Sequence, residues 1–323
     1  MTDLYTLSAF SYQLLILLTV ILSKAIVSHF MQHEPLRYFY FYCQKLSDKV
    51  NKLQNSSQQQ IIAGLVAMIV TLSPIIVILW LFEAFVAVDF IWQALLLYFA
   101  LGSFGLAQIN KTIAQALMSK QNYLAKQTLN PWVLRATEQL SSLGLSKACI
   151  EMHLLRTLQQ GYTVAMVFIM FGPLMAICYR LLLEMHYCWN SKLTRFHYFG
   201  LYVKRLVNII QWLPVRVFAT LLLFTSLGNN FILFWRLSKQ HFFKLNSTIA
   251  LLLLALSLEI KLGGVAMYDN TGKLRKSSFN DLARQPQVTD IIHGTTKVNN
   301  IIYISLFFIV LLAVAIEFVI DNI

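Results

Sequence analysis

Long apolar runs alternate along the chain with segments that carry most of the charge. Residues 61–82 form one such run of 22 residues without a charged side chain. A helix of about 20 apolar residues crosses about 30 Å of hydrocarbon, because it rises about 1.5 Å per residue. By this pattern the sequence predicts six hydrophobic runs: 8–27, 61–82, 84–106, 162–183, 213–235 and 301–320.

One of these runs is a candidate for a re-entrant segment, because Gly172-Pro173 interrupts 162–183 near its middle. A further apolar stretch, 249–258, is too short to span and is expected to be a buried or interfacial helix. The sequence therefore predicts an all-α, polytopic helical membrane protein with about five transmembrane helices plus amphipathic or interfacial helices. The whole chain, 1–323, is expected to form a single membrane domain.

Polar segments separate the apolar runs and carry the positive charges. These water-facing segments are 29–60, 107–160, 184–212 and 236–300. Cytoplasmic loops are enriched in Lys and Arg, so the scarcity of positive charge at both chain ends and in the 83–89 turn predicts that both termini lie outside. Segment 184–212 conflicts with this assignment, because it would also lie outside although it carries four Lys and Arg residues. Either 162–183 is re-entrant or one span is miscounted.

Composition supports the membrane assignment. Hydrophobic residues make up 58% of the chain and charged residues 12%, whereas soluble domains average about 25% charged residues. A net charge of +12 would suggest nucleic-acid binding in a soluble protein, but here the positive charges lie between apolar runs. The expected partner is therefore the lipid bilayer and not nucleic acid, and the expected location is the bacterial inner (cytoplasmic) membrane, as a multi-pass protein.

The sequence shows no spacing typical of a metal site. The cysteines at 43, 149, 178 and 188 include no C-x-x-C pair, and the seven histidines are scattered. The G-x-S-x-G motif of α/β-hydrolases is also absent. We therefore predict no metal ligands.

Two arginines stand out in apolar surroundings. Arg216 lies near the start of an apolar run and must reach the interface, form an ion pair or face a polar cavity. Arg180 and Glu184 are four residues apart on one helical face and are expected to pair locally. We expect Arg180, Arg216 and the Gly263-Gly264 turn to share a polar cavity.

Five short motifs occur in a consistent order over nearly the whole chain. F-G-P-L-M-A-I-C-Y-R at 171–180 resembles the G-P-x-G-A-x-x-Y-R/K span of the AmpE and CobD/CbiB superfamily, and Q-W-L-P-V-R at 211–216 resembles the W-[VI]-P-V-R of its AmpE branch. H-E-P-L-R at 33–37, I-K-L-G-G at 260–264 and Q-P-Q-V-T-D-I at 285–291 are shorter likenesses. The candidate site residues that this resemblance implies are His33, Arg37, Gly161, Gly172, Pro173, Tyr179, Arg180, Pro214, Arg216, Gly263 and Gly264.

The resemblance implies two different functions. The cobalamin branch joins adenosylcobyric acid to an aminopropanol derivative through an amide and uses ATP and magnesium, which calls for acidic side chains. That branch carries its acids in an A-E-N-L-S-D-G-like stretch, whereas the matching stretch here, 155–161, has Arg156 and Gln160 at the two acidic positions. The sequence therefore favours the AmpE-like, non-catalytic branch, without a cofactor.

On this interpretation the protein has a sensory or accessory role in cell-wall and β-lactamase-induction signalling, with other membrane proteins or cell-wall fragments as partners. The alternative is an adenosylcobinamide-phosphate synthase of the CobD/CbiB type, an ATP- and Mg-dependent amide ligase. For that alternative Glu151 is the catalytic candidate, because a shifted alignment places it near the cavity. A membrane scaffold or transporter is the second alternative, although the sequence shows no internal repeat.

Overall fold

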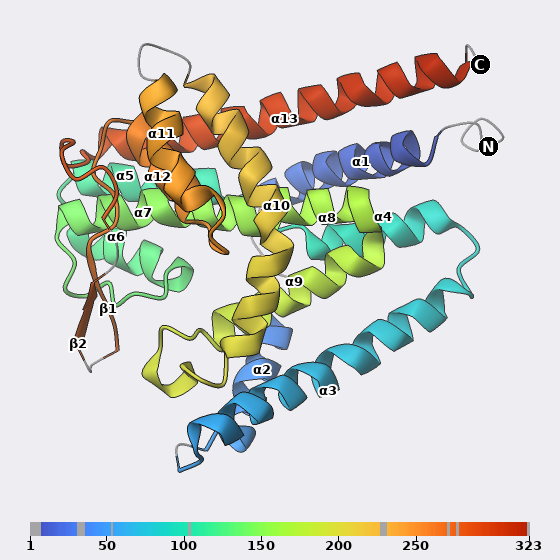
Figure 1. The fold of residues 1–323 in the computed structure, drawn as a ribbon, viewed down its shortest axis with the longest axis horizontal. Coiled ribbons are helices and arrows are strands. Elements are labelled where there is room, and N and C mark those ends of the chain that lie inside the picture. Colours follow the sequence, from blue (N-terminus) through green and yellow to red (C-terminus); the bar gives the residue numbers. More distant parts are fainter. Residues whose placement is uncertain are drawn as a thin grey trace.

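The computed structural model describes residues 8–30, 36–52, 54–102, 105–226, 231–269, 272–275 and 278–321. Most of these residues lie in helices (Figure 1). The α-helices are α1 (Ala9–Phe30), α2 (Arg37–Val50), α3 (Ser57–Glu83), α4 (Asp89–Ala100), α5 (Leu106–Met118), α6 (Asn122–Leu129), α7 (Ser142–Arg156), α8 (Thr163–Phe171), α9 (Pro173–Cys188), α10 (Leu201–Thr225), α11 (Phe231–Phe242), α12 (Thr248–Ser257) and α13 (Thr289–Asp321). Shorter helical turns are η2 (Asn130–Trp132), η3 (Thr157–Tyr162) and η4 (Thr194–Phe196).

Two short strands accompany the helices. β1 (Val265–Asp269) and β2 (Gly272–Arg275) pair antiparallel as a hairpin. β1 also joins the helical body, because the amide of Ala136 donates to the carbonyl of Met267 at 2.9 Å. The hairpin thus lies against the segment between α6 and α7.

Four helices are long and apolar enough to cross a membrane: α1, α3, α10 and α13. Their outward surfaces stay apolar, as Trp80 on α3 (61% exposed) and Phe318 on α13 (71% exposed) illustrate. Such side chains are stable on the outside of a protein where they face lipid. The protein is therefore an all-α, multi-pass membrane protein.

The long helices do not all share one direction. In Figure 1, α1, α3 and α13 extend toward the same side of the molecule, whereas α10 crosses them. α10 packs against α3, α9, α12 and α13 along this path. It thus connects the lower and upper parts of the helical body in this view.

The predicted run 162–183 is not one continuous helix. α8 ends at Phe171 and α9 begins at Pro173, so the chain turns back at Gly172 and the two helices pack as a hairpin (Figure 1). Gly172 has φ +84° and ψ −178°, a conformation that is essentially restricted to glycine. The break therefore follows directly from the Gly-Pro pair, because Pro173 opens α9 at a position where its missing N–H is not needed.

Two other predicted boundaries are corrected. The run 84–106 contains the 12-residue helix α4, which follows α3 after the 84–88 turn and packs against α9 and α1. The run 213–235 is divided, because α10 starts already at Leu201 and ends at Thr225, and α11 starts at Phe231. The polar residues at the start of α10 masked this helix in the sequence.

The apolar interior has two parts. One lies among α5, α6, α7 and α12 with parts of α10 and α13, and the other joins α1, α3, α4, α8 and α9. All residues from Ile249 to Leu256 of α12 are at most 9% exposed. The expectation of a buried helix in the short run 249–258 is therefore confirmed.

Candidate functional site

A polar cavity of about 640 Å³ opens between α2, α7 and α9. The segment after η2, residues 190–192 and Tyr268 of β1 complete its walls. Six charged side chains line it, four of them positive: Arg37, Arg135, Arg156, Lys192, Glu151 and Glu184. The excess of positive charge favours a ligand with phosphate or carboxylate groups.

Glu151 holds one wall of the cavity in place. Its carboxylate, on α7, pairs with the guanidinium of Arg135 and accepts the backbone N–H of Gly263 at 2.9 Å. Glu151 is 2% exposed and Arg135 is 9% exposed, so the pair is largely shielded from water. Gly263 and Gly264 both have positive φ, which lets the chain turn so that this N–H points at the carboxylate.

A second buried pair lies under the opposite wall. Arg180 and Glu184, one turn apart on α9, form a salt bridge of 2.7 Å, as predicted from their spacing. With its carboxamide oxygen facing the two guanidinium groups, Gln160 accepts from Arg156 at 2.8 Å and from Arg180 at 3.1 Å. The side chain that replaces an acid of the cobalamin branch thus connects Arg180 with Arg156.

Arg156 is held by two aromatic rings. Its guanidinium lies 4.3 Å from the ring centroid of Tyr187 and 5.8 Å from that of Trp132, and it donates to the carbonyl of Trp132 at 3.2 Å. A guanidinium stacked on aromatic faces keeps its orientation. Arg156 is therefore the best positioned cation of the cavity.

Tyr187 belongs to a hydrogen-bond network that fixes this wall. Its hydroxyl donates to the side chain of Gln159 at 2.9 Å, and that side chain contacts Gln211 of α10 at 3.3 Å. Gln211 donates to the hydroxyl of Tyr179 at 2.8 Å, which donates back to the carbonyl of Gln159 at 3.0 Å. α9, η3 and α10 are thus joined by polar side chains behind the cavity.

His186 adds an uncharged imidazole to the lining. Burial, reinforced by the positive charges of Lys192 and Lys204, lowers the pKa of His186 to about 4. The ring is therefore neutral near pH 7, and among the described residues its Nδ1 has no hydrogen-bond partner. A neutral imidazole at this place can accept a hydrogen bond from a ligand.

The described residues do not fit a magnesium site of their own. No group of three or more His, Cys, Asp or Glu side chains comes together in this part of the chain. Both acids that line the cavity are already paired with arginines. We therefore assign no residue to a metal.

The structure brings some of the predicted site residues together. Arg37 and Glu151 line the cavity, and Arg180, Tyr179 and Gly263 lie in the layer that supports it. Among the glycines of the motifs, Gly161 borders a neighbouring cavity and Gly172 forms the α8–α9 turn. His33 lies outside the described residues.

The structure places Arg216 away from the cavity that we expected it to share with Arg180. Its guanidinium donates to the carbonyls of Phe242 at 2.8 Å and Asn246 at 3.2 Å, and also to that of Lys244. Arg216 thus binds the backbone that follows α11. Pro214 lies within α10, two residues before Arg216.

Other lining residues escaped the sequence-based prediction: Trp132, Arg135, His186, Tyr187 and Lys192. They come from two segments that are distant in the sequence, 132–135 and 186–192, and none belongs to one of the five motifs. The best available signal was Arg156, which the sequence marked only as a departure from the cobalamin branch.

Comparisons with known proteins agree with the resemblance to the superfamily. The model of the family described as CobD/Cbib protein matches residues 16–298. A cobalamin biosynthesis protein CobD from Chromobacterium violaceum is 26% identical over 66% of this chain and 68% of its own length. Proteins of the same name from Leptospira interrogans (28% identical, 61% of this chain, 62% of its own length) and Stutzerimonas stutzeri (25%, 72% and 76%) are also similar.

The match spans less than two thirds of the Leptospira protein. No solved structure matches the chain. The prediction that favoured the AmpE-like branch and a signalling role is wrong, because the family model and these relatives are of the CobD type. With the family model matching most of its length, the chain belongs to the CobD/CbiB protein family.

Proposed function

We propose that this protein is an enzyme of cobalamin biosynthesis, an adenosylcobinamide-phosphate synthase that works in the bacterial inner membrane. It would join the carboxyl group of adenosylcobyric acid to the amine of an aminopropanol derivative, using ATP. The family membership and the CobD relatives support this reaction class. The observation that carries the proposal is the cavity in which four cations surround a space of small-ligand size.

The chemistry of amide formation explains why such a cavity is needed. ATP first transfers a phosphoryl group to the carboxylate, and the amine then attacks the carbonyl carbon. The C–N bond forms, the bond from carbon to the phosphate oxygen breaks, and inorganic phosphate leaves. Each species carries phosphate or carboxylate charge, which Arg156 and Arg37 are placed to neutralise.

The surrounding residues have distinct parts in this proposal. Glu151 holds Arg135 in place, and Tyr187 orients Arg156. The neutral His186 offers a hydrogen-bond acceptor that orients the attacking amine. Because the described residues do not form a magnesium site, we derive no step from a protein-held metal.

A growth experiment tests the proposed reaction in cells. A bacterium that depends on cobalamin and lacks its own CobD gene is given this chain, and its growth is compared on cobyric acid and on cobinamide. Cobinamide already contains the amide, so it serves as the internal control. We expect the chain to restore growth on cobyric acid.

The opposite result is equally clear. If the chain is present in the membrane at normal level and the cells grow on cobinamide but not on cobyric acid, the proposed reaction is wrong. Expression is checked by immunoblotting of the membrane fraction.

A further inference from the structure

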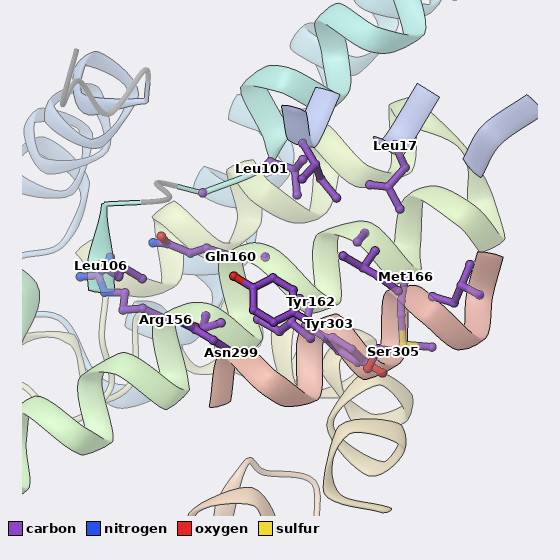
Figure 2. Close-up of a pocket in the computed structure, with 18 of the residues that line it drawn as sticks. Leu17, Leu101, Leu106, Arg156, Gln160, Tyr162, Met166, Asn299, Tyr303 and Ser305 are labelled. Atoms are coloured by element: carbon purple, nitrogen blue, oxygen red, sulfur yellow. The ribbon is translucent and has the colours of Figure 1, made fainter. Parts of the chain in front are cut away.

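A second cavity, of about 290 Å³, lies next to the polar one and differs from it in character. Its walls come from α1, α5, α7, η3, α8 and α13. Figure 2 shows Arg156, Gln160 and Asn299 at one end and Leu17 and Met166 toward the other. The cavity therefore has a polar end and an apolar end.

The apolar end lies between helices that are fitted to the membrane. Leu17 of α1 and Leu306 and Ile309 of α13 line it, and both helices are long and apolar enough to span. Tyr303 lines the cavity while it is 66% exposed, so the cavity reaches the outer surface of α13. Next to it, Phe307 is 64% exposed, so the surroundings of this opening are apolar.

The polar end contains a buried imidazole whose hydrogen bonding is incomplete. His153 lines the cavity and is 2% exposed, and among the described residues neither of its ring nitrogens forms a hydrogen bond that meets normal geometry. A buried polar group of this kind destabilises the protein when nothing satisfies it. Arg156 and Gln160 bring further donors to the same end. These groups fit a ligand that is polar where it meets them.

We propose that this cavity binds one acyl chain of a membrane phospholipid, with the glycerol ester and phosphate at the end formed by His153, Arg156 and Asn299. An apolar cavity of about 150 Å³ already holds a benzene molecule, so a cavity of about 290 Å³ accommodates a substantial part of one chain. The lateral opening between lipid-facing helices provides the route of entry. Arg156 borders both cavities, but the test below measures lipid contact and not amide synthesis, so the two proposals can fail separately.

Photo-crosslinking tests the proposal directly. The purified protein is reconstituted in phosphatidylglycerol vesicles that contain a trace of the same lipid with a diazirine in one acyl chain, and the crosslinked residues are mapped by mass spectrometry. We expect crosslinks at Met166, Leu306 and Ile309 in addition to the general lipid contacts at Phe307 and Phe308. Crosslinks confined to the outer residues would overturn the proposal.

Two variants provide a matched comparison on α8. Ala165→Phe adds a ring at the cavity wall, whereas Met170→Phe changes a residue of the same helix that is 49% exposed. We expect Ala165→Phe to reduce crosslinking at Leu306 at least fivefold without affecting Phe308, and Met170→Phe to change neither. Equal crosslinking at Leu306 in both variants would contradict the inference.

Should Ala165→Phe fail to fold, as judged by gel filtration in detergent, Ile309→Phe fills the cavity from α13 instead and has the same expected result.

Parallel experiments in phosphatidylethanolamine vesicles show whether the polar end prefers an anionic headgroup. Binding of both lipids supports recognition of the shared glycerophosphate. Crosslinking of neither lipid inside the cavity would overturn the proposal.

Discussion

At the scale of single residues, the polar cavity depends on buried charges that are held by specific partners. The pair of Glu151 and Arg135 combines two largely buried groups, and Gly263 supplies a third contact. Such a pair adds little net stability compared with apolar residues, but removal of one partner leaves an uncompensated charge. Its loss should therefore be costly.

Glu151→Ala should lower the free energy of unfolding by about 3–5 kcal/mol, because Arg135 would stay buried without a carboxylate. Chemical denaturation in a mild detergent measures the change. Asp48→Ala is the matched control, since its ion pair with Arg195 is about half exposed and should contribute less than about 1 kcal/mol. Similar losses in the two variants would contradict the buried role of Glu151.

The lowered pKa of His153 predicts how the stability of the protein depends on pH. Burial lowers the pKa of His153 to about 4, although the neighbouring Asn299 acts in the opposite direction. The unfolded chain, with an ordinary value of about 6.5, therefore binds the proton more readily, so stability is highest above pH 6.5 and falls as the pH decreases toward 4. At pH 5 the loss from this residue should be about 2 kcal/mol.

Thermal unfolding at pH 7.5 and pH 5 measures this dependence. His153→Gln should make the difference between the two pH values smaller, whereas His197→Gln, at an exposed position, should leave it unchanged. An unchanged pH dependence in His153→Gln would show that other groups cause it.

The sequence allowed part of this residue-level description to be predicted. The spacing of Arg180 and Glu184 predicted their pair, because residues four apart share a helical face. The partners of Glu151 and Arg216 could not be predicted, since each depends on segments that only tertiary packing brings together. Arg156 was the basis for favouring the AmpE-like branch, because its position in the motif showed that an acid is missing. The position could not show that two aromatic rings hold this arginine at the cavity.

At the scale of elements, the hairpin of α8 and α9 positions one wall of the site. It exists because the chain reverses at Gly172, and α9 then carries Glu184, His186 and Tyr187 to the cavity. The Gly-Pro pair in the sequence predicted this break between the two helices. The β1–β2 hairpin had no such signal, because its short strands lie in a polar segment.

Gly172→Ala should destabilise the protein by about 1–3 kcal/mol through backbone strain at its positive φ. A steric clash would not contribute, because an added Cβ would meet no atom within 4 Å. Gly161→Ala is the matched control: its surroundings are equally open, but its φ is not in the positive range. That substitution should be neutral or stabilise the helical segment by up to about 1 kcal/mol. Equal effects of both substitutions on unfolding would contradict the assigned turn.

At the scale of the whole molecule, the arrangement of the helices removes the conflict between the predicted topology and the positive charges of segment 184–212. The outer ends of α1 and α13 and the α3–α4 turn lie at the same side in Figure 1, and α5, α6, α7 and the β-hairpin lie at the other. Because the chain returns at Gly172 and α10 crosses the other long helices, segment 184–200 stays with the remaining basic segments. Hydropathy predicted the apolar runs but not these directions, which packing sets.

Labelling in intact cells tests this topology. Cysteines are placed at Phe85, Tyr123 and Tyr198, all exposed, in a background where the partly exposed Cys178 is replaced by Ser. A membrane-impermeant maleimide should label Phe85→Cys in intact cells and the other two only after lysis, because basic segments remain cytoplasmic. Labelling of Tyr198→Cys in intact cells would contradict the arrangement.

The most direct test of the proposed function is amide synthesis by the purified protein. Wild-type protein in detergent is incubated with adenosylcobyric acid, aminopropanol phosphate, ATP and magnesium, and the product is identified by its mass. We predict product formation, a loss of about 10²-fold in Arg156→Gln, and normal activity in Arg205→Gln, whose arginine is exposed on α10. Folded wild-type protein that forms no product, or an Arg156→Gln variant as active as wild type, would contradict the account.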